Sequence, residues 1–126
     1  MDENISQLLG ETLVSVTGEK GQDEMTFVTE SGKTFMMYHD QDCCEHVSIE
    51  DISGDLNDLV GSPITKAEQS SNQNEVPGVT NYGDESHTWT FYLLATVRGY
   101  VTIRWLGVSN GYYSESVTFQ EQKKVA

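Results

Sequence analysis

The chain has 126 residues and a formal net charge of −13 at pH 7, with 20 acidic and 7 basic residues. This charge repels nucleic-acid phosphate and anionic lipid, and it attracts basic protein surfaces over about 8 Å at physiological salt. The length suits a single domain over residues 1–126 with its own core, and no apolar run approaches the roughly 18 residues of a membrane span.

The first third of the chain predicts a short helix followed by a meander of strands. Ile5, Leu8 and Leu9 have helical spacing, with Asn4 as a possible N-cap and Gly10 as a stop. From residue 11 the apolar period changes to two, which predicts strands near residues 12–16, 25–27, 35–37 and 47–50.

The middle of the chain predicts a helical turn and a long loop. Ser53 can cap a turn whose apolar residues, Leu56, Leu59 and Val60, share one face. A short strand is expected near Ile64. The polar segment 70–86 is expected to be a loop.

The last third predicts three long strands. Residues 88–97 and 100–105 are rich in aromatic and β-branched side chains and are separated by Arg98 and Gly99. Asn110 and Gly111 mark a second tight hairpin, because type I′ turns need positive φ at both central residues. We therefore expect a mainly β protein, an antiparallel sandwich or open barrel with one or two short helices, whose exposed edges allow a homodimer.

Arg104 has two interpretations in this meander. With two-residue hairpin loops it lies opposite Leu93 and Val117, on an apolar face with Trp89, and then needs a carboxylate or a bound anion as partner. A one-residue shift of register instead turns Arg104 to solvent and places its strand neighbours inside, namely Val101, Ile103 and Trp105.

The acidic residues are concentrated in the middle of the sequence. Between Lys33 and Arg98 the chain has one basic residue, Lys66, and eleven carboxylates. These predict an acidic face for a basic partner, formed by Asp40, Asp42, Glu45, Glu50, Asp51, Asp55 and Asp58.

The two cysteines, Cys43 and Cys44, are adjacent and are expected to stay unpaired, because the Cβ vectors of neighbouring residues diverge in an extended chain. With His39 and His46 they have the atom types of a zinc site. Four ligands within eight residues do not have the usual zinc spacing, however, so no metal is expected. The acidic start of the chain lacks the features of a signal peptide, which predicts a cytosolic protein.

Several stretches resemble a family of small accessory proteins encoded by bacteriophages and prophages. They are residues 39–45, 49–52, 54–56, 61–64, 88–92, 101–105 and 109–114. The resemblance implies a phage accessory protein in the cytoplasm of an infected bacterium, a class that often counters host immunity. It implies no catalytic residues.

Three functions remain open from the sequence. The first is a non-enzymatic anti-defence protein that inhibits a host immune protein, such as a CRISPR nuclease, through the acidic face. The second is a sponge for a cyclic nucleotide messenger, held by Arg98, Arg104, Trp105, Tyr92, Tyr112 and Asn110. The third is a small metal-dependent enzyme centred on His39, Cys43 and His46. No phosphate-binding loop, dinucleotide-binding glycines or nucleophile elbow is present, so we expect no enzymatic activity and no cofactor.

Overall fold

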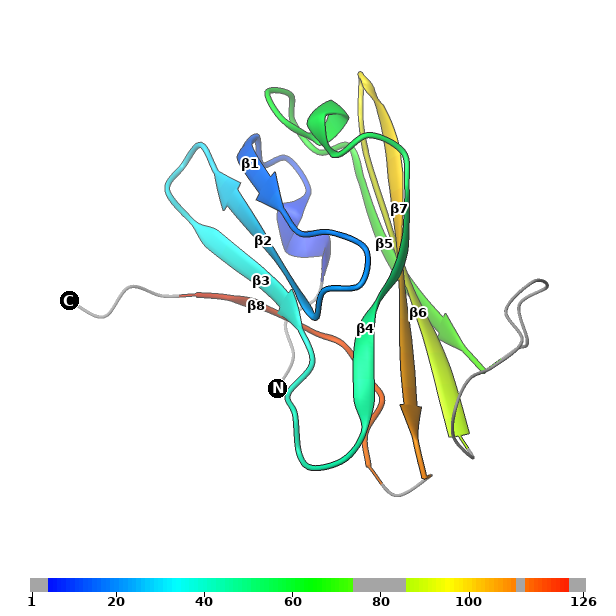
Figure 1. Cartoon of the computed structure of the whole chain (residues 1–126). Coiled ribbons are helices and arrows are strands. Elements are labelled where there is room, and N and C mark those ends of the chain that lie inside the picture. Colours follow the sequence, from blue (N-terminus) through cyan, green and yellow to red (C-terminus); the bar gives the residue numbers. More distant parts are fainter. Residues whose placement is uncertain (1–4, 74–85, 111–112, 123–126) are drawn as a thin grey trace.

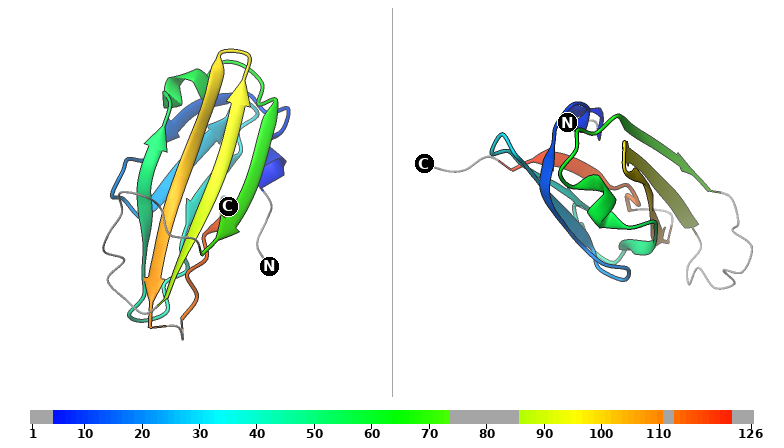
Figure 2. Two further views of the ribbon diagram at one scale, coloured as in Figure 1. Left: turned by 90° about the vertical axis from the view of Figure 1, so that its right-hand side faces the viewer. Right: turned by 90° about the horizontal axis from the view of Figure 1, so that it is seen from above.

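Two four-stranded antiparallel sheets form the protein. The computed structural model describes residues 5–73, 86–110 and 113–122. One sheet has the strand order β1-β2-β3-β8 and the other β4-β7-β6-β5. They lie as two layers in Figures 1 and 2. The elements are η1 (Ile5–Leu8), β1 (Leu13–Thr17), β2 (Glu24–Thr29), β3 (Thr34–Tyr38), β4 (His46–Ser53), η2 (Leu56–Leu59), β5 (Lys66–Asn72), β6 (Ser86–Thr96), β7 (Gly99–Ser109) and β8 (Thr118–Glu121).

The mainly β fold class and the N-terminal meander are confirmed. β1, β2 and β3 pair in chain order, with Phe27 opposite Phe35. The short helical pieces η1 and η2 are both 3-10 helices. The predicted cap Asn4 lies outside the described residues. No helix among the described residues is long and apolar enough to cross a membrane.

The core lies between the two sheets and follows the alternation of the strands. Its large side chains come from both layers, and Phe119 of β8 stacks on Phe35 of β3 with ring centroids 5.2 Å apart. The indole Nε1 of Trp105 in β7 donates a hydrogen bond to Met37 Sδ in β3 at 3.1 Å. The inward residues of β7 are Val101, Ile103 and Trp105, all 0% exposed.

The predicted three-stranded meander at the C-terminus is wrong in its last strand. β6 and β7 form a hairpin, but β8 pairs with β3 in the other sheet. The chain crosses between the layers through residues 113–117, where Glu115 lies against Gly107 of β7. Val117 is therefore in the core and does not lie opposite Arg104. Of the predicted hairpin turn, Gly111 lies outside the described residues.

The hairpin between β6 and β7 differs from the prediction by two residues. Thr96 pairs with Gly99, so Val97 and Arg98 form the loop and Arg104 lies opposite Phe91, not Leu93. A shift of two residues preserves the side-chain face, because side chains alternate with a period of two. Arg104 accordingly shares a face with Phe91, but this is the outer face of the sheet, viewed in the left panel of Figure 2.

Two boundaries in the middle of the chain also differ from the predictions. The cap of η2 is Asp55, not Ser53: the Asp55 carboxylate accepts a hydrogen bond from Asn57 N at 2.9 Å, while Ser53 is the last residue of β4. The predicted start of the loop 70–86 is too early, because β5 extends through Asn72, which pairs with Trp89 of β6. The remainder of that loop, residues 74–85, lies outside the described residues.

Candidate functional site

Acidic side chains follow β4 from one end of its sheet to the other. Asp40 and Asp42 are exposed in the β3–β4 loop, and Asp55 is exposed where η2 begins. Between them lie the half-buried side chains of Glu50 and Asp51, and Asp58 follows within η2, where its carboxylate lies against Gly99 at the β6–β7 turn. Since β4 is an edge strand of its sheet, the carboxylates of the β3–β4 loop, of β4 and of the start of η2 follow that edge, and Figure 1 shows the backbone that carries them, from the β3–β4 loop to η2. We call this set the acidic edge: Asp40, Asp42, Glu50, Asp51, Asp55 and Asp58.

The β1–β2 turn adds two carboxylates that sequence reasoning missed. Ile49 of β4 exchanges backbone hydrogen bonds with this turn, from Gly21 N at 2.7 Å and to Gln22 O at 2.8 Å. The contact places exposed Asp23 and Glu24 beside the start of β4, around an open hollow of about 360 Å³. The exposed cation Lys20 belongs to the same turn. These residues are distant from β4 in sequence, so only the folded turn reveals them.

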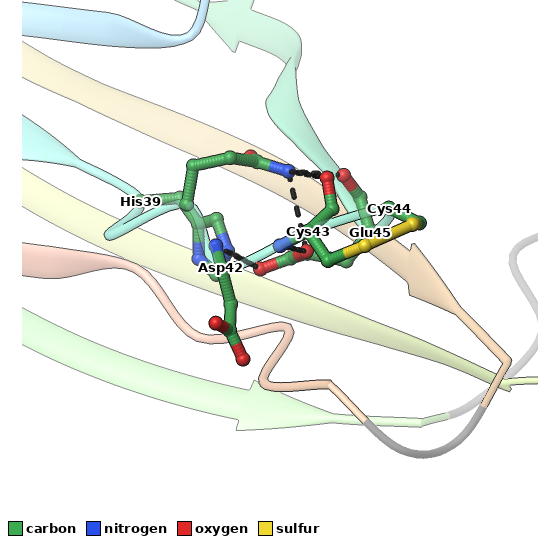
Figure 3. The surroundings of a disulfide bond; sticks show 6 residues. His39, Asp42, Cys43, Cys44 and Glu45 are labelled. Atoms are coloured by element: carbon green, nitrogen blue, oxygen red, sulfur yellow. Dashed lines mark hydrogen bonds and ion pairs between the residues drawn. A yellow bond between two sulfur atoms is a disulfide. The ribbon is translucent and has the colours of Figure 1, made fainter.

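Glu45 was predicted on the exposed acidic face, and this is wrong. Its side chain is 0% exposed, because the β3–β4 loop folds around it (Figure 3). The carboxylate accepts hydrogen bonds from the backbone N–H groups of Asp42 and Cys43, both at 2.9 Å, and from Gln41 Nε2 at 3.2 Å. His39 Nε2 contacts the same carboxylate at 2.7 Å. Glu45 therefore organises the loop and is not available to a partner.

His39 and Glu45 form a buried hydrogen-bonded pair. The pKa of Glu45 is lowered to about 2, chiefly by the hydrogen bond with His39 and also by the backbone N–H groups of Cys43 and Asp42, against the opposing effect of burial. The other ring nitrogen of His39, Nδ1, lies 2.6 Å from the carbonyl oxygen of Ser116. Through these two contacts His39 ties the β3–β4 loop to the segment before β8.

The four side chains with the atom types of a zinc site, those of His39, Cys43, Cys44 and His46, do not form a metal site. Cys43 and Cys44 are joined by a disulfide, so the expectation of unpaired cysteines is wrong. Both nitrogens of His39 are engaged, and His46 lies at the start of β4, beside the β1–β2 turn. Across residues 5–73, 86–110 and 113–122, no three His, Cys, Asp or Glu side chains gather in a group able to hold a metal ion.

An open hollow of about 390 Å³ lies between the β3–β4 loop and the segment that leads to β8. The loop contributes His39, Asp40, Gln41 and Asp42, and the other wall is formed by Ser114, Ser116 and Thr118. The hollow lies at one end of the acidic edge, and its two walls are joined by the bond between His39 and Ser116.

Arg104 meets a carboxylate, as the first interpretation required, while Val101, Ile103 and Trp105 lie inside, as the second required. A β-bulge between Ile49 and Asp51 makes Glu50 an extra residue in β4, and bulges redirect side chains. Glu50 Oε2 accepts a hydrogen bond from Arg104 Nε at 2.6 Å and lies 2.5 Å from Nη2. The guanidinium lies 5.0 Å from the centroid of the Trp89 ring, in cation–π contact. This cation is therefore neutralised within the protein.

The alternative ligand-binding set is not assembled on one surface. Tyr92 and Trp105 are fully buried between the sheets, whereas Arg104 lies on the outer face. Arg98 is at the β6–β7 turn, where its Nη1 donates to Val60 O at 3.3 Å. Asn110 is exposed beyond the far end of β7, and Tyr112 lies outside the described residues.

A second buried carboxylate holds the crossing segment in place. Glu115 is 8% exposed. It accepts hydrogen bonds from Thr88 Oγ1 at 2.7 Å and from Ser109 Oγ, so β6 and β7 both bind the segment that carries Ser114 and Ser116. The outer wall of the hollow thus rests on the β6–β7 hairpin.

Fold and site together define a two-sheet antiparallel β protein with an acidic edge and a disulfide-bearing loop. The chain belongs to the family described as a domain of unknown function, DUF7448, whose model matches residues 6–119. No curated protein and no solved structure matches the chain.

Proposed function

We propose that this protein is a non-enzymatic binding protein whose acidic edge docks on the basic surface of a host defence protein, as in phage-encoded anti-defence proteins. The observation that supports it best is the gathering of separate sequence segments into one acidic edge along β4, joined there by Asp23 and Glu24. The phage context rests on the sequence resemblance of residues 39–45, 88–92 and 101–105.

The electrostatics of this edge favour recognition of a cationic partner. Asp40, Asp42 and Asp55 are exposed, so their carboxylates can approach lysine and arginine side chains without unfolding the protein. Complementary charges of this kind accelerate association and select partners more than they increase affinity. Glu50 contributes less, because Arg104 already neutralises it.

The test measures binding as a function of salt. A tagged protein captures its partner from a bacterial lysate, and affinity for the purified partner is then measured from about 0.1 M to about 1 M salt, where the Debye length falls from about 10 Å to about 3 Å. Docking through the acidic edge predicts a steep loss of affinity. An affinity that is independent of salt would refute this mechanism.

Matched charge variants localise the contact. Asp40→Asn with Asp55→Asn removes one charge from each end of the acidic edge, and asparagine preserves the cap of η2. The control, Glu30→Gln with Glu68→Gln, removes two exposed carboxylates elsewhere. Binding should weaken with the first pair only. Equal weakening by both pairs would indicate a nonspecific effect of net charge and contradict the proposed site.

A further inference from the structure

The Cys43–Cys44 disulfide is exposed at the tip of the β3–β4 loop. Both cysteines are accessible to solvent, and in the view of Figure 3 the Glu45 carboxylate lies between His39 and the bond. Because the residues are adjacent, the bond closes a small ring that contains their shared peptide group. Opening the bond frees this peptide to change conformation, with no need to unfold either sheet.

The peptides beside this ring are the ones that hold Glu45. Cys43 N donates to Glu45 Oε1, and Asp42 N donates to Glu45 Oε2. The side chain of Gln41 bridges the carbonyl oxygens of Cys43, at 3.2 Å, and Glu45, at 2.7 Å. A change at the disulfide is therefore transmitted to the backbone donors of the buried carboxylate.

The connection continues to the neighbouring segment. Glu45 holds His39, and His39 holds the carbonyl of Ser116 across the hollow of about 390 Å³. Three consecutive contacts thus lead from the backbone of Cys43 to both walls of that hollow.

We propose that Cys43–Cys44 is a thiol–disulfide exchange site for a dithiol reductant, and that its reduction loosens the Glu45 loop and reshapes the adjacent hollow. One thiolate of the reductant attacks a cysteine sulfur, forms a mixed disulfide and expels the other cysteine as a thiolate. The second thiolate of the reductant then displaces the remaining cysteine. Two electrons and two protons pass to Cys43 and Cys44, and the reductant becomes a disulfide.

The surrounding charge selects among reductants. Exposed Asp40 and Asp42 lie in the same loop as the disulfide, so an anionic thiolate reagent is repelled and a cationic one is attracted. Expressed relative to the rate of the same thiol with a small uncharged disulfide, which cancels the different intrinsic nucleophilicities of the thiolates, the rate of reduction at low salt should fall in the order cysteamine, 2-mercaptoethanol, mercaptoacetate. High salt should reduce the differences. This inference does not rest on the proposed docking function.

The first experiment tests the bond itself. Protein purified without reductant is denatured and alkylated with iodoacetamide, before and after treatment with dithiothreitol. We expect no modified cysteine before treatment and two after it, measured by mass spectrometry. Two modified cysteines before treatment would overturn the proposal.

The second experiment tests the coupling by amide hydrogen exchange. Reduction should accelerate exchange at Asp42 and Cys43, whose N–H groups bind Glu45, and in residues 114–117, while the inward part of β7 remains protected. The double variant Cys43→Ser with Cys44→Ser should show the reduced pattern permanently and no response to dithiothreitol. Unchanged exchange in the reduced wild-type protein would overturn the coupling even if the disulfide is present.

Discussion

Replacing Gly107 by alanine places a methyl group where the crossing segment already lies. The added Cβ would be 2.5 Å from the carbonyl oxygen of Glu115 and 2.8 Å from its Cβ. Carbon atoms in good contact are about 3.5–4 Å apart, so the segment must retreat by roughly 1 Å. Such overpacking typically costs about 1–3 kcal/mol.

The retreat also affects the hydrogen bonds of the Glu115 carboxylate with Thr88 and Ser109. Weakening one charge-assisted bond adds about 1–2 kcal/mol, and the lower backbone entropy of unfolded alanine returns about 0.5–1 kcal/mol. The expected destabilisation is therefore about 1–4.5 kcal/mol. For a chain of 126 residues, with about 2.1 cal/mol/K of unfolding entropy per residue, the melting temperature falls by roughly 4–17 °C.

The assay is thermal unfolding followed by circular dichroism, with urea titration as a check of the free energy. Thr102→Ala, on the outer face of the same strand, is the control and should change stability by less than about 1 kcal/mol. A Gly107→Ala protein that melts within about 2 °C of wild type would show that the crossing segment does not lie rigidly on β7.

Three further predictions concern stability. Because the folded pKa of Glu45 is lowered to about 2, the contribution of this carboxylate to the free energy of unfolding is present above about pH 4.5 and is lost as pH falls toward 2. Urea titrations between these pH values should show that Glu45→Gln no longer has this pH dependence. An equal decrease of the unfolding free energy with pH in variant and wild type would refute the prediction. Glu50→Gln removes the carboxylate from a pair whose two side chains are each 26% exposed, so urea titration should show a loss of about 1 kcal/mol or less. A loss above about 3 kcal/mol would contradict solvent screening of the pair. Phe119→Ala removes a buried ring stacked on Phe35 and should cost about 3–5 kcal/mol by the same measurement; a cost below about 1 kcal/mol would contradict the pairing of β8 with β3.

Local patterns in the sequence were enough to predict the strands. Alternation of apolar residues is a property of neighbouring positions, so the meander β1–β2–β3 and the long strands β6 and β7 could be predicted without knowledge of the fold. The acidic character of the β4 segment likewise depends on composition alone. Boundaries were less accurate, as for η2, where Asp55 and Ser53 are both acceptable caps by residue type.

Contacts between distant segments required the tertiary structure. The Glu45 loop could not be predicted from residue types, because a glutamate among exposed acids is buried only when His39 and the loop's own N–H groups surround it. The partner of Arg104 depended on a bulge, which adds one residue to β4 and directs Glu50 toward the guanidinium. Charge and apolar alternation depend on residue types at neighbouring positions, so the sequence by itself determined the strands and the negative charge of the surface. Strand partners and buried polar contacts depend on where the chain returns in space, so only the folded structure decided that β8 joins β3 and that Glu45 lies inside its loop.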